Sequence, residues 1–163
     1  RAIRLRSDVE RKRLFGLVPD ASSRDGANAA DIYTAAASAR TFARLAELAG
    51  EVLAAGFPVI VDATFIRRAH REDFRRVARG LGVGFHILFC DAPREELERR
   101  VQARQRAASD PSEADLDVLA AQLASAEFPD AAAEPGTLRV AGSGPEEVGA
   151  LLARIGADAV PPD

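Results

Sequence analysis

The stretch that most limits the fold is residues 58–65, which read Pro-Val-Ile-Val-Asp-Ala-Thr-Phe. Three branched aliphatic residues follow one another without polar alternation, so the run predicts a strand that is buried on both faces. Such strands are typical of parallel α/β sheets, which bind ligands at the carboxyl ends of their strands. Asp62 falls at that end, where a charge needs a function or a partner. The alternative reading of Asp62 is a helix cap or an ion-paired aspartate.

Strand patterns and helix patterns alternate along the rest of the chain. Strands are predicted at residues 2–5, 58–62, 83–90 and 137–141. Helices are predicted from a cap at Ser7 or Asp8 to Gly16, and at about residues 31–55, 68–80, 93–106, 110–126 and from 145 onward. Asp110 is the expected N-cap of the fifth helix, with Pro111 in its first turn. This alternation predicts a parallel sheet with helices on both faces.

Composition excludes several classes of protein. The chain has 163 residues, enough for one domain, and its net charge of −3 argues against broad nucleic-acid or membrane affinity. Cys90 is the only cysteine, which excludes a disulfide framework and a cysteine-based zinc site. Without a long apolar run or a signal peptide, we expect a cytoplasmic location. The bias toward Ala and Arg is typical of a GC-rich bacterial gene, and the start without Met, inside a strand, predicts part of a longer protein.

Polar residues follow three of the predicted strands, where a parallel sheet binds ligands. They are Asp8 after the first strand, Asp62 and Thr64 after the second, and Asp91 after the third. A separate group of arginines lies in the helix predicted at about residues 93–106.

Arg100 and Arg104 are four residues apart and therefore share one helix face, with Arg106 close by. Guanidinium groups match phosphate oxygens, so these arginines suit a lid over phosphates. The alternative is a solvated basic face that pairs with Glu95, Glu96 and Glu98.

Five short motifs occur in the order seen in small P-loop kinases. They are Arg-Ser-Asp-Val-Glu-Arg at 6–11, Val-Ile-Val-Asp-Ala-Thr-Phe at 59–65, Cys-Asp-Ala-Pro at 90–93, Arg-Val-x-x-Arg at 100–104, and Asp-Pro-Ser-Glu-Ala-Asp at 110–115. In this the chain resembles the "AAA family ATPase", zeta-toxin-like and polynucleotide-kinase-like kinase domains of bacteria. The resemblance runs from residue 1 to about 150.

The resemblance implies a P-loop NTPase fold of the nucleoside-kinase type, at residues 1–156, with a lid at about 100–115 and a tail at 157–163. It implies ATP and Mg²⁺ as cofactors. The implied residues are Asp8 as the base for the substrate hydroxyl, Arg11 as a substrate or phosphate contact, Asp62 on the magnesium side through water, Thr64 and Arg106 near the nucleotide, and Arg100 and Arg104 as lid arginines. Tyr33 and Arg40 are candidate substrate contacts, because the loop 17–30 and the start of the long helix follow Asp8. A plain helix N-cap is the alternative for Asp8.

One motif of these kinases is absent. The sequence contains no Gly-x-x-x-x-Gly-Lys-Ser/Thr phosphate loop. In the strand order 2-3-1-4-5 that the resemblance implies, the absent first strand lies in the middle. We therefore expect residues 2–5 and 58–62 on one side of a gap, and residues 85–90 and 137–141 on the other, with the inner strand edges unpaired. A sheet that is continuous across this point would contradict the expectation.

The predicted function is transfer of the γ-phosphate of ATP to a hydroxyl of a small-molecule or nucleotide-like substrate. Some similar domains follow an aminoglycoside-phosphotransferase-like domain, so a fused upstream domain is an expected partner. Broad nucleic-acid affinity and membrane association are not expected. Two alternatives stay open. The chain is a degenerate kinase-like domain that serves as a non-catalytic binding or regulatory module, or it is an ATPase or nucleic-acid-end enzyme.

Overall fold

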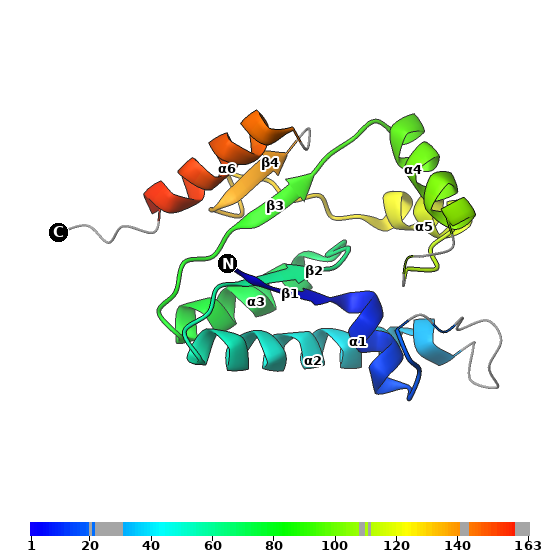
Figure 1. Cartoon of the computed structure of the whole chain (residues 1–163), viewed down its shortest axis with the longest axis horizontal. Helices are drawn as coiled ribbons and strands as arrows, with labels where there is room; N and C mark the ends of the chain where they lie inside the picture. Colours follow the sequence, from blue (N-terminus) through cyan, green and yellow to red (C-terminus); the bar gives the residue numbers. More distant parts are fainter. Residues whose placement is uncertain (20, 22–30, 108–109, 111, 141–143, 159–163) are drawn as a thin grey trace.

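The computed structural model describes residues 1–19, 21, 31–107, 110, 112–140 and 144–158. Strands and helices alternate along the chain, as predicted (Figure 1). The elements are β1 (Ile3–Arg6), α1 (Ser7–Leu14), the 3₁₀ turn η1 (Asp31–Tyr33), α2 (Ala35–Ala54), β2 (Val59–Asp62), α3 (Arg68–Gly80), β3 (Ile87–Cys90), α4 (Arg94–Ala107), α5 (Leu116–Ser125), β4 (Thr137–Val140) and α6 (Pro145–Asp158).

The four strands form two separate parallel pairs. β1 pairs with β2, which places Arg6 opposite Asp62, and β3 pairs with β4, which places Cys90 opposite Val140. Within the described residues, β2 and β3 do not pair with each other. The strands therefore group as predicted, with one pair on each side of a gap, and the predicted α/β fold class is confirmed.

The main core lies between the first strand pair and its helices. Leu45 and Ala49 recur at helical spacing on α2 and pack with Phe74 of α3, and all three are buried. Partly buried side chains from both strands and from the following segments complete the cluster. They are Leu5, Phe42, Ala46, Val59, Val61, Phe65 and Phe85. In Figure 1, α2 and α3 lie together along one side of β1 and β2, whereas α6 lies beside β4.

The prediction that residues 58–62 are buried on both faces is wrong. Val59 and Val61 point toward the core, but Ile60 is 49% exposed. Successive side chains of a strand point to opposite faces, so only one face of β2 is covered by α2. Leu88, at the middle of β3, is likewise 40% exposed. The two strands that border the gap thus carry half-exposed apolar side chains.

Three predicted helix starts are also wrong. The N-cap of α1 is Arg6, and no side chain caps that helix, so neither Ser7 nor Asp8 has this role. The long helix α2 begins at Ala35, where Thr34 accepts a hydrogen bond from the Ala37 N–H at 3.1 Å. The fifth helix begins at Leu116 rather than near residue 110.

Asp115 is the N-cap of α5, because its carboxylate accepts a hydrogen bond from the Val118 N–H at 3.0 Å. Asp110 instead accepts from the Ser112 N–H at 2.9 Å, and Pro111 lies outside the described residues. Two residues of the predicted 157–163 tail belong to α6, which runs to Asp158. No helix in the described ranges has the length and apolar character needed to cross a membrane.

Candidate active site

Asp8 lies in the first turn of α1, directly after the carboxyl end of β1. It shares a face of this short helix with Arg11 and Lys12, because residues three and four apart are neighbours on a helix. Burial raises the pKa of the Asp8 carboxyl above its ordinary value. A hydrogen bond from the Ser112 side chain and the positive charges of Arg11 and Arg6 oppose that rise. A partly buried carboxylate that is easy to protonate suits a group that accepts a proton.

Arg11 connects α1 to the segment that precedes α2. Its Nη1 donates to the Ile32 carbonyl oxygen at 2.8 Å, and its guanidinium lies 5.4 Å from the centre of the Tyr33 ring. Burial lowers the pKa of Arg11, and the nearby Asp8 carboxylate opposes that change. The Nε of Arg11 is buried and has no hydrogen-bond partner among the described residues. Asp8, Arg11 and Tyr33 therefore form one group, and their role toward a substrate stays a prediction.

A strap that comprises Asp110 and residues 112–115 lies against this face of α1. Arg6 donates to both carboxylate oxygens of Asp110, at 2.9 and 3.2 Å. Lys12 Nζ lies 3.1 Å from Glu113 Oε1, and the two side chains are only 3% and 16% exposed. Ser112 lies between these two ion pairs in the sequence, and its side chain favours the ionised form of the Asp8 carboxyl. The strap thus covers the candidate base with polar groups.

Asp62, at the end of β2, is an ion-paired aspartate. Its carboxylate accepts from Nε of Arg4 at 3.1 Å and from Nη2 of the same residue, and it lies 3.7 Å from Nε of Arg6. The parallel register explains this contact, because Arg6 lies directly opposite Asp62. Arg6 therefore links the carboxylates of Asp62 and Asp110.

The described residues offer few ligands for a magnesium ion. No group of three or more His, Cys, Asp or Glu side chains in the described part of the chain could hold a metal. Mg²⁺ usually keeps several waters and binds one or two carboxylates together with substrate phosphates. Asp62 fits that pattern only as a contact through water, and Arg4 and Arg6 share its oxygens.

The segment after β2 is held in a strained conformation. Phe65 has φ = +43°, a left-handed backbone that costs about 1–3 kcal/mol for a residue with a side chain. Its ring packs edge-on against Phe42 and Phe74, and its carbonyl oxygen accepts a hydrogen bond of 2.7 Å from Arg71. Arg71 in turn makes a bidentate pair with Glu134, at 2.8 and 2.6 Å. These contacts fix the backbone next to Thr64, whose side chain is exposed.

The predicted lid arginines point to different partners. Arg100 is 59% exposed and pairs with Glu96 at 2.6 Å, which is the solvated arrangement given above as the alternative. Hydrogen bonds from Arg99 and Arg100 lower the pKa of Glu96 to about 2. Arg104 instead turns toward the strap, where its Nη2 lies 3.5 Å from the Ala114 carbonyl oxygen. Arg106 is exposed at the end of α4.

Arg40 also differs from the other predicted substrate contacts. It is exposed on α2, and its guanidinium lies over the Phe15 ring, 5.3 Å from the ring centre. The structure thus brings together Asp8, Arg11, Tyr33 and Arg104, the last through the strap, and gives Arg40 and Arg100 other contacts.

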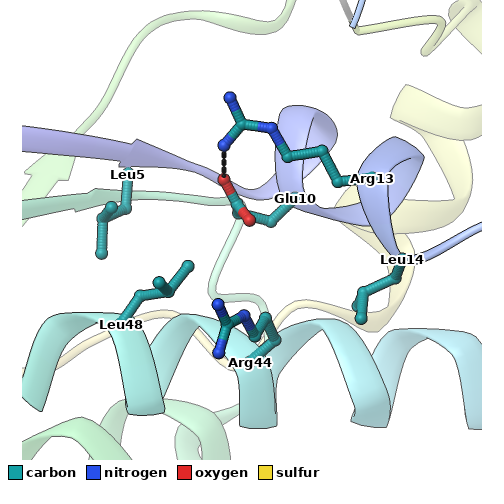
Figure 2. A pocket seen from close by; sticks show the side chains of 6 residues that line it. All are labelled: Leu5, Glu10, Arg13, Leu14, Arg44 and Leu48. Carbon is teal, nitrogen blue, oxygen red and sulfur yellow. Dashed lines mark hydrogen bonds and ion pairs between the residues drawn. The ribbon is translucent and has the colours of Figure 1, made fainter. Parts of the chain in front are cut away.

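A separate open pocket of about 330 Å³ lies between β1, α1 and α2 (Figure 2). Glu10 and Arg13 line it, and Nη1 of Arg13 lies 2.5 Å from Oε1 of Glu10. Both lie on the face of α1 opposite Asp8 and Arg11, because the two sets differ by about half a helical turn. The other lining residues are Leu5, Leu14, Arg44 and Leu48. This pocket therefore contains none of the predicted site residues.

Four residues of the site were not predicted from the sequence: Arg6, Lys12, Ser112 and Glu113. Arg6 could have been found from strand pairing, since it ends the strand that lies beside Asp62. Lys12 could have been singled out because it is the only lysine of the chain. Ser112 and Glu113 appeared to belong to a helix start, and only the tertiary structure shows that they contact α1.

Comparison with known proteins identifies the family of the chain. The family model described as an AAA domain matches residues 1–129, which is most of the chain. The chain belongs to this AAA domain family. Its recognition as a P-loop kinase-like protein is thereby confirmed. No curated protein matches the sequence.

Among solved structures, this member of the family is similar to a gluconokinase from Sinorhizobium meliloti 1021. The two share 22% sequence identity with a TM-score of 0.60, and the match covers 97% of this chain and 79% of the gluconokinase. At this level of identity the likeness establishes a common fold and leaves the substrate open.

Proposed function

We propose that this AAA domain chain is the acceptor-side part of an ATP-dependent kinase that phosphorylates a hydroxyl group of a small molecule. One observation carries the proposal. A partly buried aspartate with a raised pKa follows the carboxyl end of β1, and the positive charges of Arg6 and Arg11 act on it. Arg104 contacts the strap, where it acts on Asp110.

In the proposed reaction, Asp8 accepts the proton of the substrate hydroxyl. The hydroxyl oxygen then bonds to the γ-phosphorus, the bond from that phosphorus to the β-phosphate oxygen breaks, and ADP leaves. Phosphoryl transfer depends mainly on position and on neutralising negative charge. Arg11 and Arg104 would supply positive charge near Asp8, and Tyr33 would contact the substrate. Arg100 and Arg106 would join them only after a movement of α4, since Arg100 now pairs with Glu96.

The nucleotide side of the site needs a phosphate loop that this sequence lacks. We propose that a strand–loop–helix unit carrying this loop fills the gap between β2 and β3. The unpaired inner edges of these strands, and the half-exposed side chains of Ile60 and Leu88, support that position. Asp62 and Thr64 would then lie beside the loop. Magnesium, when bound with ATP, would neutralise phosphate charge, with Asp62 contacting it through water.

A second candidate function is a non-catalytic binding or regulatory module. The ion pairs favour it, because Asp62 is held by Arg4 and Arg6 and Arg100 is held by Glu96. They describe a stable surface that does not depend on a nucleotide.

An acceptor panel separates the two functions. The protein extended at its N-terminus to include the phosphate-loop unit is incubated with ATP, Mg²⁺ and one hydroxyl compound at a time, from polyols, hydroxy acids and nucleosides. We expect ADP to form with one class and not with its matched analogue that lacks the hydroxyl. ADP formation at the same rate with every compound, or with none, would favour an ATPase or a binding module instead.

A further inference from the structure

β1 is an outer strand of its sheet. It pairs with β2 on one side, and within the described residues no strand pairs with its other side. The Ile3 N–H donates to the Pro58 carbonyl oxygen at 2.8 Å, so the backbone groups of Ile3 face β2. Those of the next residue, Arg4, face outward, because successive residues of a strand direct their backbone groups to opposite sides. An outer edge of this kind is a template for a further strand.

The pocket between β1, α1 and α2 adjoins this edge. Leu5, Leu14 and Leu48 supply its apolar lining, and Figure 2 shows the side chains of Leu5 and Leu48 between β1 and α2. Residues directly opposite each other on neighbouring strands share one face of a sheet. A residue added opposite Leu5 would therefore point to the side of the pocket. The edge offers main-chain hydrogen bonds and the pocket offers a place for one side chain, which together are the elements of peptide recognition by strand addition.

The charges that line the pocket favour an acidic partner. They are the guanidinium groups of Arg13 and Arg44 and the carboxylate of Glu10. Glu10 is buried and already pairs with Arg13, whose side chain is 61% exposed. Arg44 pairs on its own helix with Glu47, which is 64% exposed and does not line the pocket. The lining thus carries an excess of positive charge, and both arginines are accessible to a carboxylate from outside.

A second copy of the chain fits this edge poorly. In antiparallel self-pairing through the outward backbone groups, the two registers with the greatest overlap place arginine opposite arginine, as Arg4 against Arg4 or Arg4 against Arg6. Like charges directly opposite each other destabilise a strand pair. An acidic residue at the same place would instead face Arg4, whose side chain is 59% exposed although it pairs with Asp62.

We propose that the outer edge of β1 and the adjoining pocket bind an extended acidic segment of a partner protein. The segment adds a strand beside β1, places an aliphatic side chain against Leu5, Leu14 and Leu48, and directs carboxylates to the arginines around them. This surface lies on the face of α1 opposite Asp8, so the inference goes beyond the proposed function and does not depend on it.

The test uses the 163-residue chain and a fluorescein-labelled, amidated peptide in which glutamate alternates with leucine. We expect saturable binding by fluorescence anisotropy and slower hydrogen exchange of the Arg4 amide, because that N–H gains a partner. The Ile3 amide is the internal control, since it already donates to Pro58. Two matched peptides should not bind: one has lysine in place of glutamate, and the other is methylated at its backbone nitrogens.

A charge reversal in the pocket provides the matched variants. Arg44→Glu should weaken binding of the glutamate peptide about fivefold, the contribution of one exposed ion pair. Arg79→Glu makes the same charge change at an exposed position on α3 and should leave binding unchanged. Absence of binding, equal binding of the lysine peptide, unchanged exchange at Arg4, or equal affinity of the two variants would overturn the proposal. Dimers in sedimentation that protect the Arg4 amide without peptide would overturn it too, by assigning the edge to a second copy.

Discussion

Replacing Asp8 with asparagine is expected to lower the rate of phosphoryl transfer by the extended protein about 10²–10⁴-fold, the usual contribution of a general base. Asparagine is close to aspartate in shape, but it cannot take up the proton of the substrate hydroxyl. The measurement is the initial rate of ADP formation with the acceptor that the panel identifies. Asp117→Asn, an exposed aspartate on α5, is the matched control and should leave the rate unchanged.

The same substitution should stabilise the fold, which a helix cap would not do. Because burial raises the pKa of Asp8, the folded chain binds its proton more tightly than the unfolded chain, and the ionised form costs stability at neutral pH. Asp8→Asn removes that cost, so its free energy of unfolding at pH 7 should exceed that of wild type. An N-cap aspartate is different, since its loss typically costs about 1 kcal/mol. In the rate measurement described above, ADP formation by Asp8→Asn at the wild-type rate would remove Asp8 from the mechanism.

Replacing Arg71 with methionine is expected to lower the free energy of unfolding by about 3–5 kcal/mol, because it leaves the Glu134 carboxylate buried without its partner. The side chains of the pair are 3% and 7% exposed, and Arg71 also binds the strained Phe65 carbonyl. Urea denaturation measures the change. Arg76→Met on the same helix is the control: its pair with Asp73 is largely exposed, so the loss should stay below about 1 kcal/mol.

Acid should reduce the difference in free energy of unfolding between Arg71→Met and wild type. The hydrogen bonds from Arg71 hold the pKa of Glu134 below its ordinary value of 4.5. A lowered acid pKa contributes stability that is present above the unfolded value and is lost as the pH falls through the folded value. The difference in free energy of unfolding between Arg71→Met and wild type should therefore become smaller below pH 4.5. If Arg71→Met lowers the free energy of unfolding at pH 7 by less than about 1 kcal/mol, the Arg71–Glu134 pair contributes little to stability.

Local sequence signals predicted the strands well, and the strand order implied by the family resemblance predicted their grouping. The run before Asp62 and the alternation of strands and helices follow from apolar periodicity, which a single sequence contains. Helix starts were less predictable. Asp110 and Asp115 both resemble N-caps, and the choice between them depends on Arg6, which binds Asp110 from a strand 104 residues away in the chain. Such a competing tertiary contact leaves no trace in the local pattern.

The candidate site was predictable only in part, for the same reason. Asp8 and Arg11 were recognised because their spacing matches a family motif and places them on one helix face. Periodicity could not decide between a phosphate lid and a solvated face for Arg100 and Arg104. In the structure Arg100 pairs with Glu96, and Arg104 contacts the strap. The ion pairs of the strap with Arg6 and Lys12 depend on its path, which no local rule predicts.

Calorimetric titration of Mg²⁺–ATP into the 163-residue chain and into the extended protein tests the central claim most directly. If the chain supplies the acceptor side and the lid while the phosphate loop comes from a unit between β2 and β3, only the extended protein should bind saturably. Its affinity should lie within the range of about 1 μM to 1 mM that is usual for enzyme substrates. Equal saturable binding by both proteins, or none by the extended protein, would contradict the account.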